Sequence, residues 1–198
     1  PYVDLKLTVP TAGGPVSDAD RGLGDVTLGV GLAWHHSERL HSVLALDYYV
    51  PTGAYSATQI ANIGRNHSAW QPVYAVSYGD ARGVRADLKL MYTLNQKNRD
   101  TGYRSGQEAH ADYAVGWGFG NGLVLGAGGY VYRQLSGDRA PAGLANAGRG
   151  RAYAIGPSLL YQAPSGWFIT AKWQQEGGVR NRSQGDALWL KTVVPLRF

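Results

Sequence analysis

Apolar and polar residues alternate along most of this chain. From Val3 to Val9 every second residue is apolar, and Asp4, Lys6 and Thr8 occupy the positions between them. Successive side chains of a β-strand point to opposite faces, so this pattern predicts a strand with one apolar and one polar face. The same period of two recurs in residues 26–34, 44–50, 70–78, 84–95, 110–119, 152–161, 167–174 and 188–198, and residues 123–134 form a further predicted strand whose faces its many glycines leave unassigned.

The ten predicted strands are long, and their connections alternate in length. Strands of soluble proteins average about five to six residues, whereas a tilted strand needs about 9 to 11 residues to cross a bilayer. Short connections are expected at 37–39, 79–82, 120–122 and 163–166, and long ones at 10–22, 51–67, 96–103, 136–148 and 177–185. Short turns at one end and long loops at the other are typical of bacterial outer-membrane barrels.

Composition narrows the classes of protein that remain. Only 17% of the residues are charged, 28 are glycine and none is cysteine, with a mean hydropathy of -0.26. The absence of cysteine excludes disulfide scaffolds and thiolate metal sites, and no sustained apolar stretch suits a membrane-spanning helix. The net charge of +5 is scattered along the chain without a basic run, so we expect no nucleic-acid partner.

These patterns predict an all-β fold, an antiparallel up-and-down transmembrane β-barrel of ten strands that forms a single domain over residues 1–198. The alternative is a soluble antiparallel barrel with an apolar interior. Glycine, alanine and serine are frequent on the polar face, which suits a lumen better than a soluble exterior. Aromatic residues toward the strand ends favour interfacial girdles; they are Trp34, Tyr48, Trp70, Tyr78, Tyr92, Trp117, Tyr161, Trp167 and Trp173.

A barrel of this kind belongs in the bacterial outer membrane. An even number of strands predicts both chain ends on the periplasmic side. The last predicted strand ends on the aromatic residue Phe198, a pattern typical of the signal that the barrel assembly machinery binds. Outer-membrane lipids and lipopolysaccharide are the other expected partners.

Charged and aromatic residues on the polar faces are the candidate site. We expect eight of them to point into the lumen: Asp47, Tyr49, Arg85, Asp87, Lys89, Asp112, Lys172 and Lys191. Both signs of charge are present, so one interpretation is a paired network that braces the interior, and the other is a polar constriction that selects solutes. Tyr49 and Phe168 add aromatic surface on which a ring-shaped solute can stack.

The histidine and serine residues that could act as metal ligands or catalytic groups do not indicate a catalytic site. His35, His36 and His41 gather around one short turn, but no carboxylate or cysteine stands at ligand spacing, so we expect no metal. His67 precedes Ser68, but adjacency in sequence is no evidence for a catalytic pair. We therefore expect no enzymatic activity and no cofactor.

Two short motifs resemble those of a known family. They are Gly22-Leu23-Gly24-Asp25-Val26 and Val50-Pro51-Thr52-Gly53-Ala54-Tyr55, and the similarity continues through residues 62–66, Trp70, Pro72, residues 106–108, His110, residues 155–157 and Phe198. The chain resembles the meta-pathway phenol-degradation family of outer-membrane proteins. The resemblance implies an additional N-terminal strand pair, which would give twelve strands, and it assigns no site residues.

The functional expectation is an outer-membrane channel for passive uptake of small aromatic or hydrophobic solutes. One alternative is a non-conducting structural or surface-binding barrel. A barrel lipase or deacylase is the remaining alternative, and it would require a Ser–His contact at the membrane rim.

Overall fold

The computed structural model describes residues 1–142 and 148–195, and this part of the chain is all-β and contains no helix. Consequently no described helix is long and apolar enough to cross a membrane. The eleven strands are β1 (Tyr2–Thr11), β2 (Gly14–Leu23), β3 (Val26–His35), β4 (Leu40–Val50), β5 (Ala69–Gly79), β6 (Arg82–Asn95), β7 (Glu108–Phe119), β8 (Leu123–Gln134), β9 (Arg151–Gln162), β10 (Phe168–Arg180) and β11 (Asp186–Val193).

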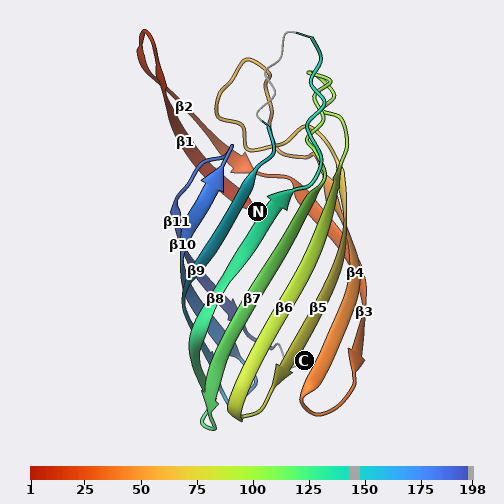
Figure 1. The fold of residues 1–198 in the computed structure, drawn as a ribbon, viewed down its shortest axis with the longest axis vertical. Coiled ribbons are helices and arrows are strands. Elements are labelled where there is room, and N and C mark those ends of the chain that lie inside the picture. The colour runs from red at the N-terminus through yellow and green to blue at the C-terminus, as the bar shows by residue number, and fades with distance from the viewer. Residues whose placement is uncertain (143–147, 196–198) are drawn as a thin grey trace.

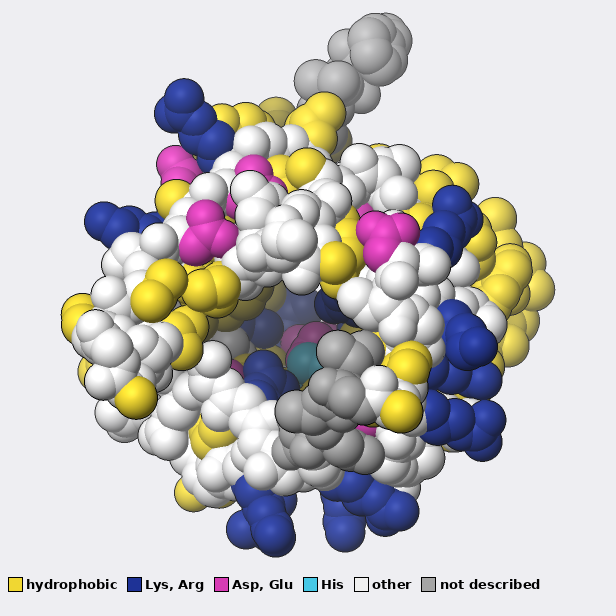
Figure 2. Space-filling model, turned by 90° about the horizontal axis from the view of Figure 1, so that it is seen from above, with side chains coloured by type: hydrophobic (Ala, Val, Ile, Leu, Met, Phe, Trp, Pro, Cys, Tyr) yellow, Lys and Arg dark blue, Asp and Glu magenta, His cyan; other side chains and the backbone are white. Residues whose placement is uncertain are grey.

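Strands β3 to β11 form one antiparallel sheet in which neighbours in sequence are neighbours in space. The strands tilt and the sheet is strongly curved (Figure 1), and seen from above the molecule is hollowed at its centre (Figure 2). The edge strands β3 and β11 are not hydrogen-bonded to each other. The antiparallel all-β prediction is thus confirmed, whereas the sheet has nine strands and is not closed.

The N-terminal region differs from the sequence prediction. Residues 10–22 were expected to be a loop, but most of them form β2, which pairs with β1 from Tyr2 opposite Leu23 to Thr11 opposite Gly14. This hairpin extends beyond the end of the sheet (Figure 1). The first predicted strand, with Asp4 and Lys6, therefore lies outside the sheet, which is why the sheet has nine strands and not ten.

The alternation of connections is as predicted within the sheet except at its last connection, because β10 continues to Arg180 and leaves residues 181–185 where a loop over 177–185 was predicted. Short turns join the strands at one end, and the segments 51–68, 96–107, 135–142 and 148–150 gather at the other (Figure 1). Because the sheet has an odd number of strands, β3 begins at the long-loop end and β11 finishes at the short-turn end. The expectation that both chain ends lie on the periplasmic side stays a prediction. Phe198 lies outside the described residues.

The outer face of the sheet is apolar and exposed. Val30 is 76% exposed, Val115 55% and Leu190 71%, whereas the buried apolar residues are mainly alanines. Aromatic residues mark both ends of this face: Tyr48 packs on Trp70 near the long loops, with ring centroids 4.4 Å apart, and Tyr161 packs on Trp167 near the short turns. This distribution of polarity is the reverse of that in soluble proteins.

Candidate functional site

The curved sheet encloses a central cavity made of two adjoining regions. The region nearer the short turns has a volume of about 370 Å³, and the region beside β10 and β11 has about 700 Å³. Both are lined by Asp112, Thr170 and Lys172, so the two regions adjoin each other. Charged side chains and a histidine are visible inside the hollow in Figure 2.

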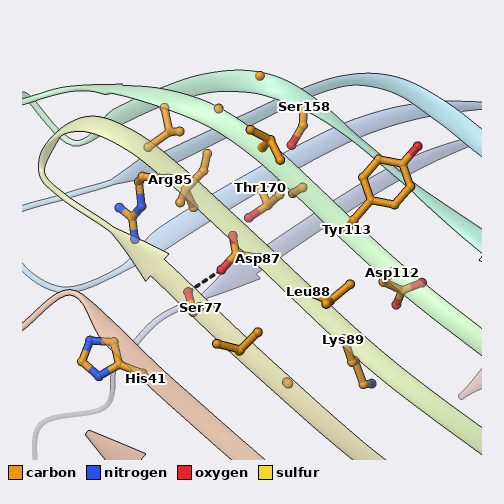
Figure 3. Close-up of a pocket in the computed structure, with 18 of the residues that line it drawn as sticks. His41, Ser77, Arg85, Asp87, Leu88, Lys89, Asp112, Tyr113, Ser158 and Thr170 are labelled. Atoms are coloured by element: carbon orange, nitrogen blue, oxygen red, sulfur yellow. Dashed lines mark hydrogen bonds between the residues drawn. The ribbon is translucent and has the colours of Figure 1, made fainter. Parts of the chain in front are cut away.

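The region nearer the short turns has a charged wall that strand alternation creates (Figure 3). Arg85, Asp87 and Lys89 are every second residue of β6, so all three face the cavity. Asp87 accepts a hydrogen bond from the Ser77 hydroxyl of β5, which stands directly opposite it. Lys89 stands opposite Asp112 of β7, so charges of both signs alternate across this wall.

The region beside β10 and β11 contains a cluster of aromatic rings. The His110 ring centroid lies 5.1 Å from that of Tyr130 and 6.1 Å from that of Tyr132, and His110 Nε2 is 2.9 Å from Asp112 Oδ1. The Arg182 guanidinium carbon lies 4.6 Å from the Tyr132 ring centroid. The cluster thus combines π-faces with a cation, which is suitable for holding a planar ring.

A second group of rings and cations stands on the neighbouring strands. Phe168 of β10 and Trp189 of β11 both line the cavity. Lys191 Nζ lies 5.8 Å from the Phe168 ring centroid, and Lys172 stands opposite Trp189 in the strand register. The cavity therefore presents aromatic surface on both β8 and the β10–β11 pair.

Six of the eight predicted residues line the two cavity regions: Arg85, Asp87, Lys89, Asp112, Lys172 and Lys191. Asp47 and Tyr49 occupy positions of the same parity on β4 but line neither region. Asp47 lies against Gly29 of β3, where an added Cβ would be 2.3 Å from Asp47 Oδ1. Glycine at position 29 therefore makes room for this carboxylate.

Both interpretations of the polar face have support in different parts of the wall. Tyr49 donates a hydrogen bond to Gln71, and Gln71 donates to Thr93, which links three strands and braces the wall. In contrast, within residues 1–142 and 148–195 no carboxylate forms an ion pair with Arg85, Lys89, Lys172 or Lys191. These cations remain available to a solute.

Several residues of the cavity wall were not predicted from the sequence. The faces of Tyr130 and Tyr132 were not predicted because β8 is rich in glycine. Their pairing with Asp112 and His110 places them on the cavity face. Trp189 was not assigned because it is itself apolar and stands between Leu188 and Leu190, so polarity does not separate its face from theirs. Glu176, which accepts a hydrogen bond from Tyr130, and Arg182 also line the cavity without an earlier assignment.

The motifs behind the family resemblance meet at the long-loop end of β3 and β4. Asp25 Oδ1 accepts a hydrogen bond from the Gly53 backbone N–H at 3.0 Å, and Asp25 Oδ2 accepts one from the Arg65 N–H at 3.0 Å. The Thr52 hydroxyl accepts from the Val26 N–H and donates to the Gly24 carbonyl. The motifs thus clamp the base of the 51–68 loop to the start of β3.

The histidines do not assemble a recognisable catalytic or metal centre. His35 Nδ1 is 2.8 Å from His41 Nδ1, and His67 contacts the backbone carbonyl of Ser68 and not its hydroxyl. His36 Nε2 is 2.7 Å from Ser42 Oγ, but Ser42 is only 5% exposed. In the described part of the chain no three His, Asp or Glu residues are placed to hold a metal ion, and the absence of metal stays a prediction.

The chain matches the sequence model of a known protein family. Residues 1–192 match the family described as "Putative MetA-pathway of phenol degradation". The chain belongs to this family. The match to the phenol-degradation family includes both motifs that form the clamp at the base of the 51–68 loop, and all the residues that line the central cavity. No curated protein matches the chain.

Proposed function

We propose that this protein is a channel of the bacterial outer membrane that admits small aromatic solutes by passive diffusion. The observation that carries the proposal is the inverted polarity of the sheet, with exposed apolar side chains outside and a charged cavity inside. A surface of this kind is stable in lipid, where the apolar face meets hydrocarbon and the polar face meets water. Lipids, lipopolysaccharide and the barrel assembly machinery are then the expected partners.

The lining of the cavity supports an aromatic solute. Phe168, Tyr130 and Trp189 present rings, while Lys172 and Lys191 present cations that can bind a hydroxyl or a carboxylate group on the solute. The family name associates the chain with phenol degradation, and phenol combines a ring with a polar group. Uptake of such compounds is the role that best joins the cavity to the family.

We propose no enzymatic role, and no cofactor. A barrel lipase needs an accessible serine with a histidine and a third polar group that orients it. His36 and Ser42 are in contact, but the serine is buried, and within the described residues no carboxylate forms an ion pair with His36. The cavity itself presents charges and rings without an activated nucleophile.

Liposome swelling with phenol, catechol and a sugar of similar size as solutes tests the proposal. We expect the purified protein to admit the aromatic compounds faster than the sugar. Replacing both Phe168 and Trp189 with alanine should reduce the preference for the aromatic compounds while leaving sugar entry equal or faster. The matched control replaces Leu188 and Leu190 on the opposite face of β11 with valine, and it should keep the preference. Impermeability to all the solutes would overturn the channel.

A surface-binding role is the second candidate, and the N-terminal hairpin favours it. Asp18 of β2 accepts hydrogen bonds from the backbone N–H groups of Ile60 and Ala61, at 2.8 and 3.0 Å. The hairpin and the 51–68 loop are therefore joined into one surface beyond the end of the sheet. A folded, membrane-inserted protein that conducts no solute would favour this role over the channel.

A further inference from the structure

Within residues 1–142 and 148–195, the two edges of the nine-stranded sheet have no partner strand. Every residue of β3 is exposed, including the cavity-facing ones, and seven of the eight residues of β11 are exposed. Strands in the middle of the sheet, such as β7, are mostly half-buried. An unpaired edge leaves backbone N–H and C=O groups without hydrogen bonds, which lipid does not tolerate. Both edges therefore require another strand.

Strand direction restricts what can fill the gap. Because all neighbours in the nine-stranded sheet are antiparallel, β3 and β11 run in the same direction. Direct closure would make a parallel pair inside an otherwise antiparallel sheet. One additional strand that runs the opposite way is antiparallel to both edges, and it gives the even strand number usual for these barrels.

The position of Pro1 indicates where this strand comes from. The Gly24 N–H donates a hydrogen bond to the Pro1 carbonyl at 2.9 Å, so Pro1 lies beside the start of β3. From there β1 runs away from the sheet and β2 returns to it (Figure 1). A strand that led into Pro1 along the free edge of β3 would run opposite to β3 and to β11.

We propose that a single strand of the natural protein that directly precedes Pro1 lies between β3 and β11 and closes a ten-stranded barrel. This is one strand and not the strand pair that the family resemblance implied. Its cavity-facing side chains would complete the wall beside Trp189 and Lys191, so the binding site is incomplete without it. The proposal deepens the channel function, but its test is independent of transport.

The hairpin gives the register of this strand. The two residue numbers of each pair in the hairpin add up to 25, as in Tyr2 with Leu23. Continuing this register along β3 places Val30 opposite the sixth residue before Pro1. The second, fourth, sixth and eighth residues before Pro1 then share the outward face with Val26, Val30 and Leu32, and the residues between them face the cavity.

Disulfide formation in the natural full-length protein, in outer membranes, tests this arrangement. The described chain has no cysteine, so introduced pairs form on a clean background. Val30→Cys is combined with a cysteine at the fifth, sixth or seventh residue before Pro1, and separately with Leu190→Cys. The pair Val30→Cys and Leu46→Cys is the positive control, because these residues stand opposite each other on β3 and β4.

The proposal expects an intramolecular disulfide between Val30→Cys and the sixth residue before Pro1, or one of its neighbours, in yield similar to the control. It also expects none between Val30→Cys and Leu190→Cys. A disulfide between these last two would show direct closure of nine strands, and disulfide-linked dimers would show that a second copy covers the edge. Either result, or no disulfide upstream of Pro1 while the control forms, overturns the proposal.

Discussion

Asp25 binds the backbone of Gly53, which is 28 residues away, through a hydrogen bond of 3.0 Å from the Gly53 N–H to Asp25 Oδ1. The two residues belong to the two motifs that identify the family, one at the start of β3 and the other just after β4. The second carboxylate oxygen binds the Arg65 N–H, near the far end of the 51–68 loop. A single side chain thus holds both ends of this loop above the cavity.

Asp25→Asn should weaken this clamp at one point. The asparagine side chain keeps one acceptor oxygen, and its NH₂ group faces a backbone donor where the second carboxylate oxygen was. A charged hydrogen bond contributes about 1.5 to 3 kcal/mol, so we expect faster amide hydrogen exchange at Arg65 or Gly53, by about tenfold or more. The control is Asp20→Asn on the hairpin. Unchanged exchange at both amides would contradict the clamp.

Gly64→Ala should destabilise the same loop. Gly53 and Gly64 are in close backbone contact, and a Cβ at position 64 would be 2.2 Å from the Gly53 carbonyl oxygen. Overpacking of this kind costs roughly 1 to 3 kcal/mol. Gly185→Ala is the matched control, since nothing lies within 4 Å of its added Cβ. Urea unfolding in lipid vesicles measures the stability of both variants. Equal unfolding midpoints would contradict the predicted destabilisation by Gly64→Ala.

The contact between the hairpin and the 51–68 loop should depend on pH. Hydrogen bonds from the Ala61 and Ile60 backbone hold the pKa of the Asp18 carboxyl below its ordinary value. A lowered folded-state pKa means that the stabilisation is present above the unfolded pKa of about 4 and is lost as the pH falls through the lower folded value. Amide protection at Ile60 and Ala61 should therefore decrease on acidification below about pH 4, and Asp18→Asn should abolish this dependence. Amide protection that is constant down to pH 2 in the unmodified protein would contradict this pH dependence.

Adjacent residues of β6 should respond oppositely to the same new side chain. Leu90 is exposed on the outer face, and Lys89 lines the cavity. Arginine on the lipid face near the middle of a bilayer costs about 2 to 4 kcal/mol, so Leu90→Arg should impair folding into vesicles. Lys89→Arg keeps the charge in the cavity and should fold normally. Equal folding of the two variants would argue against a lipid-facing exterior.

The strands with strict alternation were predictable from the sequence because side-chain polarity there follows the two faces of the sheet. β2 was missed because Pro15, Asp18 and Asp20 break any apolar pattern, while its pairing with β1 depends on backbone hydrogen bonds that every residue except proline can donate. Trp189 was missed because its neighbours are apolar on the other face. In both cases the spatial neighbours, and not the local sequence, determine the structure.

The cavity was predictable only in part for a similar reason. Asp87, Lys89 and Asp112 stand on strands with clear alternation, so their direction could be predicted. The direction of Tyr130 is visible only in the register of β8 against β7, because glycine gives no polarity signal. The contact of Asp25 with Gly53 could not be predicted, because the sequence contains both motifs but does not indicate that they are close in space.

The central claim is that the curved sheet surrounds a water-filled path while its outer face contacts lipid. Single-channel recording in planar bilayers tests it most directly with two adjacent cysteine variants of β9, Ser158→Cys in the cavity wall and Leu159→Cys on the outer face. We predict stepwise conductance that a charged, thiol-specific reagent reduces in Ser158→Cys and leaves unchanged in Leu159→Cys. Absence of conductance steps from folded, inserted protein, or equal effects of the reagent on both variants, would contradict the account.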